Sequence, residues 1–444
     1  MALATAANGN MRTTDSCIRC GEVAVKQQQA SQHLDLVAFL PTGDYEGNTR
    51  RNMLAAVAHE LDRRGRGEKM LCVERPVCPL STPLKHPRKF GQWLAGLRRL
   101  RQVGPNVWAW TPTVFIHDLV ALRRPRLRQA NKKLLHKGLA RALSALEVPS
   151  PGSRLVSWVF HPFQVDCLTL AQDALKVYEC HDEYAEFAGM EAGPARQKWF
   201  LSMEAALARS AGLVLTTSQQ LAERMSAHNR RVALVPNGVE FERFHGARGA
   251  ARPAELEGVP RPIVGFVGKL NEILDFVLLG AVASRRLEWS FVFVAPFDGR
   301  PQLLAAPQFR SFASLPNVHF LGWQPYARVP AFINAFDVCT IPFVVNDLTN
   351  GIYPLKLHEY FALGKPVVAT PIRELEAFAD VAYLAGGPQA FVEAIGRALA
   401  EGSAELQQKR VNLAQANSWQ VRAQAILRLM AEAAQALSPA GASA

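Results

Sequence analysis

No apolar run in these 444 residues approaches the roughly 20 residues that a membrane-spanning helix needs. The longest run, at 291–297, has the length of a strand. Residues 1–31 also lack the apolar core of a signal peptide, and their Ala, Gln and small polar residues predict a disordered N-terminal extension. We therefore expect a cytoplasmic protein that is soluble or attached to a membrane only peripherally.

Disulfide and metal-site signals are also sparse. Seven cysteines are scattered along the chain, and the one Cys-x-x-Cys, at Cys17 and Cys20, has no second ligand pair behind it. We interpret this pair as a chance feature of the extension, with a metal or redox site as the alternative. No Asp-x-Asp triplet occurs either. We therefore expect neither a metal nor a cofactor.

Acidic residues are nearly missing from one block, since residues 81–141 contain 14 basic residues and a single acid. Of the net charge of +12, most lies in the same half: residues 1–245 carry 33 Lys and Arg against 22 Asp and Glu, whereas 246–444 carry 17 against 16. The stretches 89–103 and 122–139 fit basic amphipathic helices that lie on an anionic membrane surface. A solvated face is the alternative. No nucleic-acid motif is present, so we expect no nucleic-acid partner.

Two successive series of short apolar runs are present, and each alternates with helix-length segments. The first opens at 34–40 with strand, glycine-containing loop, helix and strand, which is the βαβ unit of an open parallel sheet. A weakly patterned linker follows, and the series restarts at 262–268. We predict an α/β fold in which two doubly wound, Rossmann-like domains face each other across a cleft. The expected boundaries are 1–31 for the extension, 32–248 and 249–418 for the domains, and 419–444 for a C-terminal helix and tail that can cross back to the first domain.

The most informative stretch is NDLTNGIYPLKLHEYFALGKPVVAT, residues 346–370. Pro354 favours a helix start and Gly364 a helix end, and the start lies where ligands bind in open α/β sheets. Free amides and the helix dipole there favour an anion such as a diphosphate. Lys356 adds a full positive charge, and Glu359 lies on nearly the same face, where its carboxylate can accept hydrogen bonds from a ribose diol. The pattern predicts a sugar-nucleotide site, and an ordinary solvated Lys–Glu pair is the alternative.

This segment resembles the donor-binding helix of GT-B glycosyltransferases, especially family 4 and the related bacterial capsule, teichuronic acid and xanthan-type enzymes. The shared pattern is Pro354, Lys356, Glu359 and the run ALGKPVV. The resemblance implies the GT-B architecture, with a nucleotide-sugar donor, most commonly a UDP-sugar, bound as a substrate on the second domain. It also implies a saccharide or lipid-linked acceptor on the first domain.

The sequence departs from the family pattern at one glutamate. Family 4 usually has two glutamates eight residues apart, and the first would lie at Gly351. This departure leaves the hydroxyl of the donor sugar without its usual partner and weakens the case for a retaining mechanism. Backbone amides near Asn350 and Gly351 could substitute, because glycine permits close approach. We therefore count Asn350, Gly351 and Tyr353 among the donor-binding residues.

A second element that fits an anion lies at the end of the first strand of the second domain. Gly268 and Lys269 resemble the family's G-[RK] segment, whose basic residue contacts the diphosphate, although a further family lysine is missing at Leu274. A plain strand-to-helix turn is the alternative. Farther along, Trp323 and Tyr326 fit either stacking on the base of the nucleotide or packing in the core.

Two residues at strand ends of the first domain are candidates for the chemistry. His161 precedes a proline, and family 4 enzymes similarly often place a His in such a context beside the donor sugar. Asp182, in CHDEY, is similar to the first-domain aspartate base of the xanthan-type inverting enzymes. The structural alternatives are a strand cap for His161 and a helix N-cap for Asp182.

The loop after the first strand, PTGDYEGNTR, resembles the acceptor-side loop of these enzymes. Its candidates for lining the cleft are Asp44, Gly47 and Arg50, and a flexible surface loop is the alternative.

Together these patterns predict a metal-independent glycosyltransferase of the hexosyltransferase type that acts in surface polysaccharide synthesis. Its expected place is the cytoplasm, with peripheral attachment to the inner face of the membrane through 81–141. Two other functions fit the same residues. One is a sugar-nucleotide epimerase of the same fold, and the other is a non-catalytic, degenerate transferase in an assembly complex, which the missing first glutamate favours.

Overall fold

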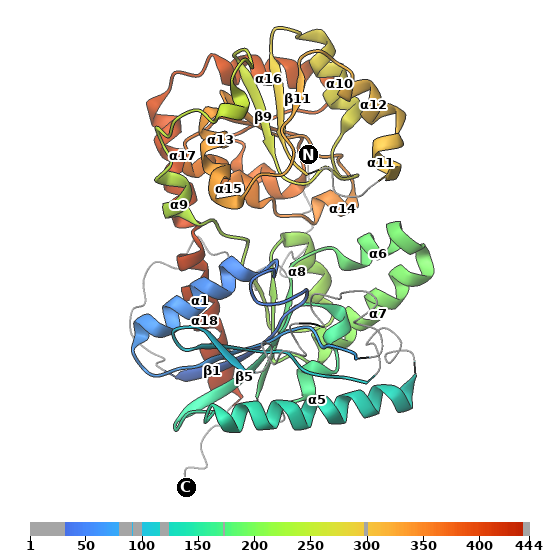
Figure 1. Cartoon of the computed structure of the whole chain (residues 1–444), viewed down its shortest axis with the longest axis vertical. Helices are drawn as coiled ribbons and strands as arrows, with labels where there is room; N and C mark the ends of the chain where they lie inside the picture. Colours follow the sequence, from blue (N-terminus) through green and yellow to red (C-terminus); the bar gives the residue numbers. More distant parts are fainter. Residues whose placement is uncertain are drawn as a thin grey trace, which may run out of the picture.

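The computed structural model describes residues 32–79, 91, 100–115, 124–171, 174–296 and 301–437. The predictions for the N-terminal extension, for the Cys17–Cys20 pair and for much of the basic block concern residues outside this set. Two α/β domains follow each other along the long axis of the molecule, the first in blue and green and the second in yellow and orange (Figure 1). Among the described helices, none has the length and apolar character needed to cross a bilayer.

The first domain is built on a sheet that has eight described strands, in the order β3-β4-β2-β1-β5-β6-β7-β8. All neighbouring strands pair in parallel except β3 and β4. The strands are β1 (His33–Phe39), β2 (Met70–Val73), β3 (Arg101–Gly104), β4 (Val107–Trp110), β5 (Ser153–Val159), β6 (Leu175–Cys180), β7 (Leu213–Thr216) and β8 (Val232–Leu234). Six of the seven residues of β1 are buried, as expected of a parallel strand covered on both faces.

Helices cover both faces of this sheet. They are α1 (Arg51–Arg64), α5 (Pro125–Ala145), α6 (Tyr184–Ala192), α7 (Pro194–Ser210) and α8 (Gln219–Ser226). Side chains alternate along β1: Leu34 and Leu36 lie in one apolar cluster with α1, whereas Val37 and Phe39 lie in another with α5 and α7. The prediction of a doubly wound domain is therefore confirmed.

Where the structure describes the basic block, part of one predicted helix is absent. The prediction of a helix over 89–103 is wrong for its last residues, because Arg101–Gly104 forms strand β3, which pairs antiparallel with β4. The tight turn between them places Asn106 at φ 53°, a left-handed conformation that Asn adopts more readily than most residues. The second predicted helix is present as α5.

The second domain has a six-stranded, fully parallel sheet in its described part, with the order β11-β10-β9-β12-β13-β14. Its strands are β9 (Ile263–Val267), β10 (Ser290–Val294), β11 (Val318–Phe320), β12 (Val338–Ile341), β13 (Val367–Ala369) and β14 (Tyr383–Leu384). Its helices are α10 (Phe276–Arg285), α11 (Pro301–Ala305), α12 (Pro307–Ala313), α13 (Val329–Ala335), α14 (Asp347–Asn350), α15 (Leu355–Ala362), α16 (Pro388–Leu399) and α17 (Ala404–Ala416), with the short α9 (Phe241–His245) before the first strand.

The C-terminal helix α18 (Trp419–Ala436) returns to the first domain and runs beside α1 (Figure 1). Its buried side chains, including Leu427 and Met430, share an apolar cluster with β1 and α1. The crossing is fixed at its start, where the Trp419 amide donates to the Val239 carbonyl at 3.0 Å. The prediction that this helix crosses back is confirmed.

The two domains also contact each other at the N-terminus of α8. The Gln219 amide donates to Glu374 Oε1 at 2.7 Å, and the Gln220 amide group donates to the Asp347 carbonyl at 2.8 Å. An ion pair between Glu223 and Arg373 adds a third link. These contacts hold the loops beside α14 and α15 against the first domain.

Candidate active site

Helix α15 begins where the second domain meets the first. Pro354 precedes it with φ −73° and ψ 111°, an extended conformation that leaves the first amides of the helix without helical partners. Gly364, at φ 72°, ends the helix as the sequence predicts. The carbonyl of Tyr353 accepts a hydrogen bond from Asn237 Nδ2 at 3.2 Å. Because Asn237 follows the last strand of the first domain, this bond fixes the start of α15 against that domain.

Lys356 lies between two aromatic rings. Its Nζ is 5.3 Å from the ring centre of Phe266 and 4.8 Å from that of Phe343. Gly268 lies against its stem, since a Cβ there would be 3.3 Å from Lys356 Cε, and its φ of 151° also favours glycine. Burial lowers the pKa of Lys356 to about 8, and the charge of Glu359 opposes that shift. The ammonium is therefore poorly solvated, and an anion would stabilise its charged form.

Glu359 shares the same helix face as Lys356 and lies in a polar network that joins the domains. Burial raises its pKa to about 7, while Lys356 and a hydrogen bond from Tyr326 lower it. The Tyr326 hydroxyl lies 3.4 Å from Glu359 Oε1, and Asn52 Nδ2 of the first domain donates to Glu240 at 3.0 Å. Asn52 Nδ2 also lies 3.5 Å from the Tyr326 hydroxyl. The carboxylate of Glu359 therefore lies at the junction of both domains.

Trp323 and Tyr326, for which the sequence left base stacking or core packing open, both lie outside the core. Trp323 is 69% exposed and Tyr326 is 40% exposed. The guanidinium of Arg243 lies 5.3 Å from the ring centre of Tyr326. The ring of Trp323 is thus accessible for stacking, whereas Tyr326 contributes its hydroxyl to Glu359.

Asp182 lies within electrostatic reach of Lys269 in the other domain. Burial raises the pKa of Asp182 to about 6, and the positive charges of Arg50 and Lys269 act in the opposite direction. Asp182 follows β6 of the first domain and Lys269 follows β9 of the second, so the effect reports their proximity. Asp182 Oδ1 accepts a hydrogen bond from the Glu183 amide at 3.0 Å, which leaves its other oxygen for a proton.

His161 caps the short 3-10 helix Pro162–Gln164 and packs its ring on Tyr184, with ring centres 4.4 Å apart. Its Nδ1 accepts the Phe163 amide hydrogen at 3.1 Å. Burial, reinforced by the charge of Arg75, lowers its pKa to about 4. The ring is therefore neutral near pH 7 with its proton on Nε2, a state that suits hydrogen-bond donation better than proton abstraction.

The position of the missing family glutamate is filled from the other domain. A Cβ on Gly351 would overlap the carboxylate of Glu183, which follows Asp182 in the first domain. Glu183 is fully buried, forms an ion pair with Arg224 and accepts from Gln220 Nε2 at 3.1 Å. A side chain at 351 therefore has no room, which gives the departure from the family pattern a physical cause. No local pattern signals this contact, because Glu183 and Gly351 are far apart along the chain.

The side chains of two predicted donor-side residues, Asn350 and Tyr353, form hydrogen bonds within the protein. Asn350 Oδ1 accepts the Arg373 amide hydrogen at 3.0 Å and so fixes the neighbouring loop. The Tyr353 hydroxyl is 2.7 Å from His358 Nε2 in the interior.

The amides of Asn350 and Gly351 donate to the carbonyls of Asn346 and Leu348, at 2.9 and 3.2 Å. The backbone amides expected to replace the missing glutamate are therefore already bonded within their own turn.

The three residues predicted in the acceptor-side loop differ in their burial. Asp44 Oδ1 accepts the Gly47 amide hydrogen at 3.0 Å in an exposed turn. Arg50 instead is only 6% exposed, forms an ion pair with Glu179 and donates to Asn237 Oδ1 at 2.8 Å. Arg50 therefore anchors the loop to the junction of the domains, while Asp44 and Gly47 lie on the surface.

Comparison with known proteins agrees with this geometry. Residues 261–401 match the family model described as Glycosyl transferases group 1. The putative teichuronic acid biosynthesis glycosyltransferase TuaH of Bacillus subtilis (strain 168) is 26% identical over 255 residues. That match covers 55% of this chain and 63% of the relative, which is less than two thirds of its length.

Solved structures extend the likeness to nearly the whole chain. A sucrose-phosphate synthase from Thermosynechococcus elongatus has a TM-score of 0.64 at 15% identity and covers 90% of this chain and 100% of its own. An alpha,alpha-trehalose-phosphate synthase (UDP-forming) from Burkholderia vietnamiensis has a TM-score of 0.62 at 16% identity, covering 90% of this chain and 99% of its own. These structures share the predicted two-domain architecture. The chain therefore has the GT-B fold of these structures, and its residues 261–401 are similar to the group 1 glycosyl transferases.

Proposed function

We propose that this protein transfers a sugar from a nucleotide-sugar donor to a saccharide or lipid-linked acceptor in surface polysaccharide synthesis. One observation carries the proposal: Lys356 and Glu359 share the first turns of α15 at the domain junction, and Asp182 lies opposite, within electrostatic reach of Lys269. This arrangement combines an anion site, a diol-binding carboxylate and a proton acceptor.

The donor diphosphate binds at the N-terminus of α15 in this proposal. The free amides, the helix dipole, Lys356 and Lys269 stabilise the charge that develops on the leaving group, so no metal is required. Glu359 accepts from the ribose diol. A structural neighbour from E. coli bound with UDP-2-fluoro glucose makes a UDP-sugar the first donor to test.

The chemical step places the acceptor on the first domain. The acceptor oxygen forms a bond to the anomeric carbon while the bond from that carbon to the diphosphate breaks, and the acceptor proton passes to Asp182. A pKa of about 6 leaves Asp182 ionised at pH 7 yet close enough to the working pH for efficient proton transfer. His161 donates a hydrogen bond from Nε2 to the donor sugar.

Two observations support the proposed cellular location, namely the similarity to the teichuronic acid glycosyltransferase and the charge of α5. The exposed face of α5 carries Arg126, Lys133, Lys137 and Arg141, and the helix contains no acidic residue. Basic residues at an anionic lipid surface contribute about 1 kcal/mol each. We therefore place the protein in the cytoplasm, docked peripherally on the inner face of the membrane.

The test is a thermal-shift panel of UDP-, GDP- and ADP-sugars followed by an assay of donor turnover. One nucleotide should raise the melting temperature by several degrees by mass action, and Glu359→Ala should remove both the shift and turnover. Isomerisation of the donor without an acceptor would identify an epimerase instead. Nucleotide binding without transfer or hydrolysis would identify a non-catalytic partner.

A further inference from the structure

The Tyr326 hydroxyl lies beside Glu359 where the two domains meet, and it has no part in the proposed reaction. Tyr326 begins the short 3-10 helix Tyr326–Arg328 of the second domain. Its hydroxyl donates to Glu359 Oε1 at 3.4 Å and lies 3.5 Å from Asn52 Nδ2, on α1 of the first domain. Among the residues that the structure describes, Tyr326 is the one hydrogen-bond donor to the Glu359 carboxylate.

This hydroxyl carries one hydrogen, and two carboxylates lie within its reach. Glu359 is one, and Glu240, directly before α9, is the other. Burial raises the pKa of Tyr326, and the charges of both glutamates raise it further. The hydroxyl therefore keeps its hydrogen near pH 7 and acts as a donor to one of the two.

Other groups already satisfy Glu240. Its Oε2 accepts from Asn52 Nδ2 at 3.0 Å, and its Oε1 lies 3.3 Å from Arg243 Nη2. Because Asn52 Nδ2 can only donate, the Tyr326 oxygen accepts from it, and the Tyr326 hydrogen is left for Glu359. A residue of the first domain thus orients the hydroxyl toward the proposed diol-binding carboxylate.

The bond from Tyr326 orients Glu359 and leaves it capacity for a ligand. An ionised carboxylate has about four acceptor positions, and the hydroxyl of Tyr326 occupies one of them. The remaining positions can accept both hydroxyl hydrogens of a ribose diol. The contact between Tyr326 and Glu359 is exposed to solvent, so a ribose can reach it.

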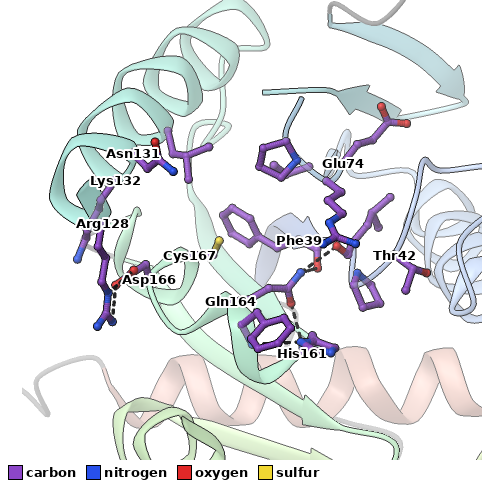
Figure 2. A pocket seen from close by; sticks show the side chains of 17 residues that line it. Phe39, Thr42, Glu74, Arg128, Asn131, Lys132, His161, Gln164, Asp166 and Cys167 are labelled. Atoms are coloured by element: carbon purple, nitrogen blue, oxygen red, sulfur yellow. Dashed lines mark hydrogen bonds and ion pairs between the residues drawn. The ribbon is translucent and has the colours of Figure 1, made fainter. Parts of the chain in front are cut away.

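The cavity of the first domain presents its acids differently. This cavity of about 190 Å³ opens beside α5 at the carboxyl ends of β1, β2 and β5. Both acids of its wall are paired with arginines. Glu74 accepts from Arg101 at 2.8 Å, and Asp166 binds Arg128 of α5 through two hydrogen bonds, at 2.6 and 2.9 Å (Figure 2). A diol in this cavity would meet no unpaired carboxylate among the residues that line it.

We propose that Tyr326 is a positioning residue for Glu359 and that the two together select a donor nucleotide that carries ribose over one that carries 2′-deoxyribose. Tyr326 holds one carboxylate oxygen in place, and Glu359 accepts from the 2′- and 3′-hydroxyls. Asn52 makes this arrangement depend on the first domain. The inference rests on the proposed glycosyl transfer and names the nucleotide class of its donor.

The experiment measures equilibrium binding to the full chain by calorimetry, with UDP, GDP and ADP each compared with its 2′-deoxy form. The nucleotide that binds should do so about ten-fold or more tightly in its ribose form, because the 2′-deoxy form lacks one hydrogen bond to a charged group. Equal affinity for the two forms would overturn this inference alone. Absence of binding by all three ribonucleotides would overturn the proposed function as well.

Two variants that each remove one tyrosine hydroxyl locate the effect. Tyr326→Phe should lower the ribose preference about three-fold or more by weakening binding of the ribose form alone. Tyr383→Phe is the matched control, because the Tyr383 hydroxyl also donates to a glutamate, Glu401, at 2.7 Å, but from the edge strand β14. Equal weakening of both nucleotide forms by Tyr326→Phe, or the same loss of preference in the control, would overturn the positioning role.

A double variant tests the contribution of the first domain. Asn52→Ala should lower the ribose preference, and it should add little to the loss in Tyr326→Phe, because both substitutions act on one hydroxyl. Additive losses would overturn the dependence on the first domain.

The pH dependence of the ribose preference separates positioning from a purely structural role. Burial raises the pKa of Glu359 to about 7, the charge of Lys356 and the bond from Tyr326 lower it, and Glu240 raises it. The preference should therefore fall as pH drops below about 7, because a protonated carboxyl accepts fewer hydrogen bonds. In Tyr326→Phe the fall should begin at a higher pH, since the lost bond no longer stabilises the ionised form. Lys356 and Arg243 act on both nucleotide forms, so the ratio of affinities removes their effect, and an unchanged midpoint would overturn the proposal.

Discussion

The two domains use charge in opposite ways. Residues 1–245 hold 11 more basic than acidic residues, and on α5 these side chains gather on an exposed face. Residues 246–444 are nearly neutral, with 17 basic and 16 acidic residues, yet burial shifts the pKa values of Lys356 and Glu359 toward their neutral forms. A shielded pair suits one small anion, whereas an exposed series suits an extended anionic surface. The proposed donor side is thus distinguished by the burial of its charges and not by their number.

The largest expected effect comes from removing the shielded ammonium. Lys356→Ala should lower kcat/KM for the donor by about 10²- to 10³-fold, as loss of one stabilising group at a developing charge does. Lys409→Ala on the exposed face of α17 is the matched control, since Lys409 forms an ion pair with the surface residue Asp380. Steady-state kinetics with both variants is the measurement. Similar losses in the two would remove the distinction between shielded and exposed charge.

We expect the first domain to supply the proton acceptor of the reaction and to contribute little to the affinity for the nucleotide-sugar. Asp182→Asn is expected to lower kcat by about 10²-fold or more while nucleotide binding stays unchanged. In the wild type, kcat/KM should rise with pH through about 6, because Asp182 must lose its proton to act as a base. Glu191→Gln on the exposed end of α6 is the control. A flat profile between pH 5 and 8 would argue against this role.

The contact between Gly351 and Glu183 tests the next largest effect, which is the coupling between the two domains. Gly351→Glu should lower activity about ten-fold and destabilise the fold by about 1–3 kcal/mol, because the new side chain overlaps a buried carboxylate. Adding Glu183→Ala should restore part of both losses. Gly402→Glu is the matched control, since a Cβ there meets no atom within 4 Å.

Thermal unfolding and kinetics of the single and double variants test this coupling. Additive losses, with no rescue by Glu183→Ala, would show that the two positions act independently.

The smallest expected effect is a pH dependence of donor binding. The pKa of Lys356 is about 8 without ligand, and a bound diphosphate favours its charged form. Affinity should therefore fall by a few fold as pH rises above about 8, and binding at pH 8 should take up a fraction of a proton. Calorimetry of a nucleotide-sugar in two buffers of different ionisation enthalpy measures that uptake. Identical heats in both buffers would place the donor phosphate away from Lys356.

Sequence reasoning predicted the bounds of α15 correctly, because that signal is local. Pro354 and Gly364 flank the short helix that carries Lys356 and Glu359, so helix-start and helix-end preferences predict where that helix begins and ends. Continuous apolar runs likewise predict the buried parallel strands. The strand β3 was missed because its basic, polar residues carry no such run and depend on pairing with β4.

Contacts between distant segments were beyond this reasoning. The carboxylate of Glu183 meets Gly351 only after both domains have folded and docked. The cavity beside α5 is assembled from the ends of three strands and one helix, none of which carries a motif for it. The neutral state of His161 likewise depends on its burial against Tyr184.

A crystal structure with a bound nucleotide diphosphate tests the central claim most directly. The account predicts phosphate oxygens within hydrogen-bond distance of Lys356 Nζ and the first amides of α15, with the ribose diol on Glu359. A diphosphate seated instead on the basic face of α5, or in the cavity of the first domain, would contradict it.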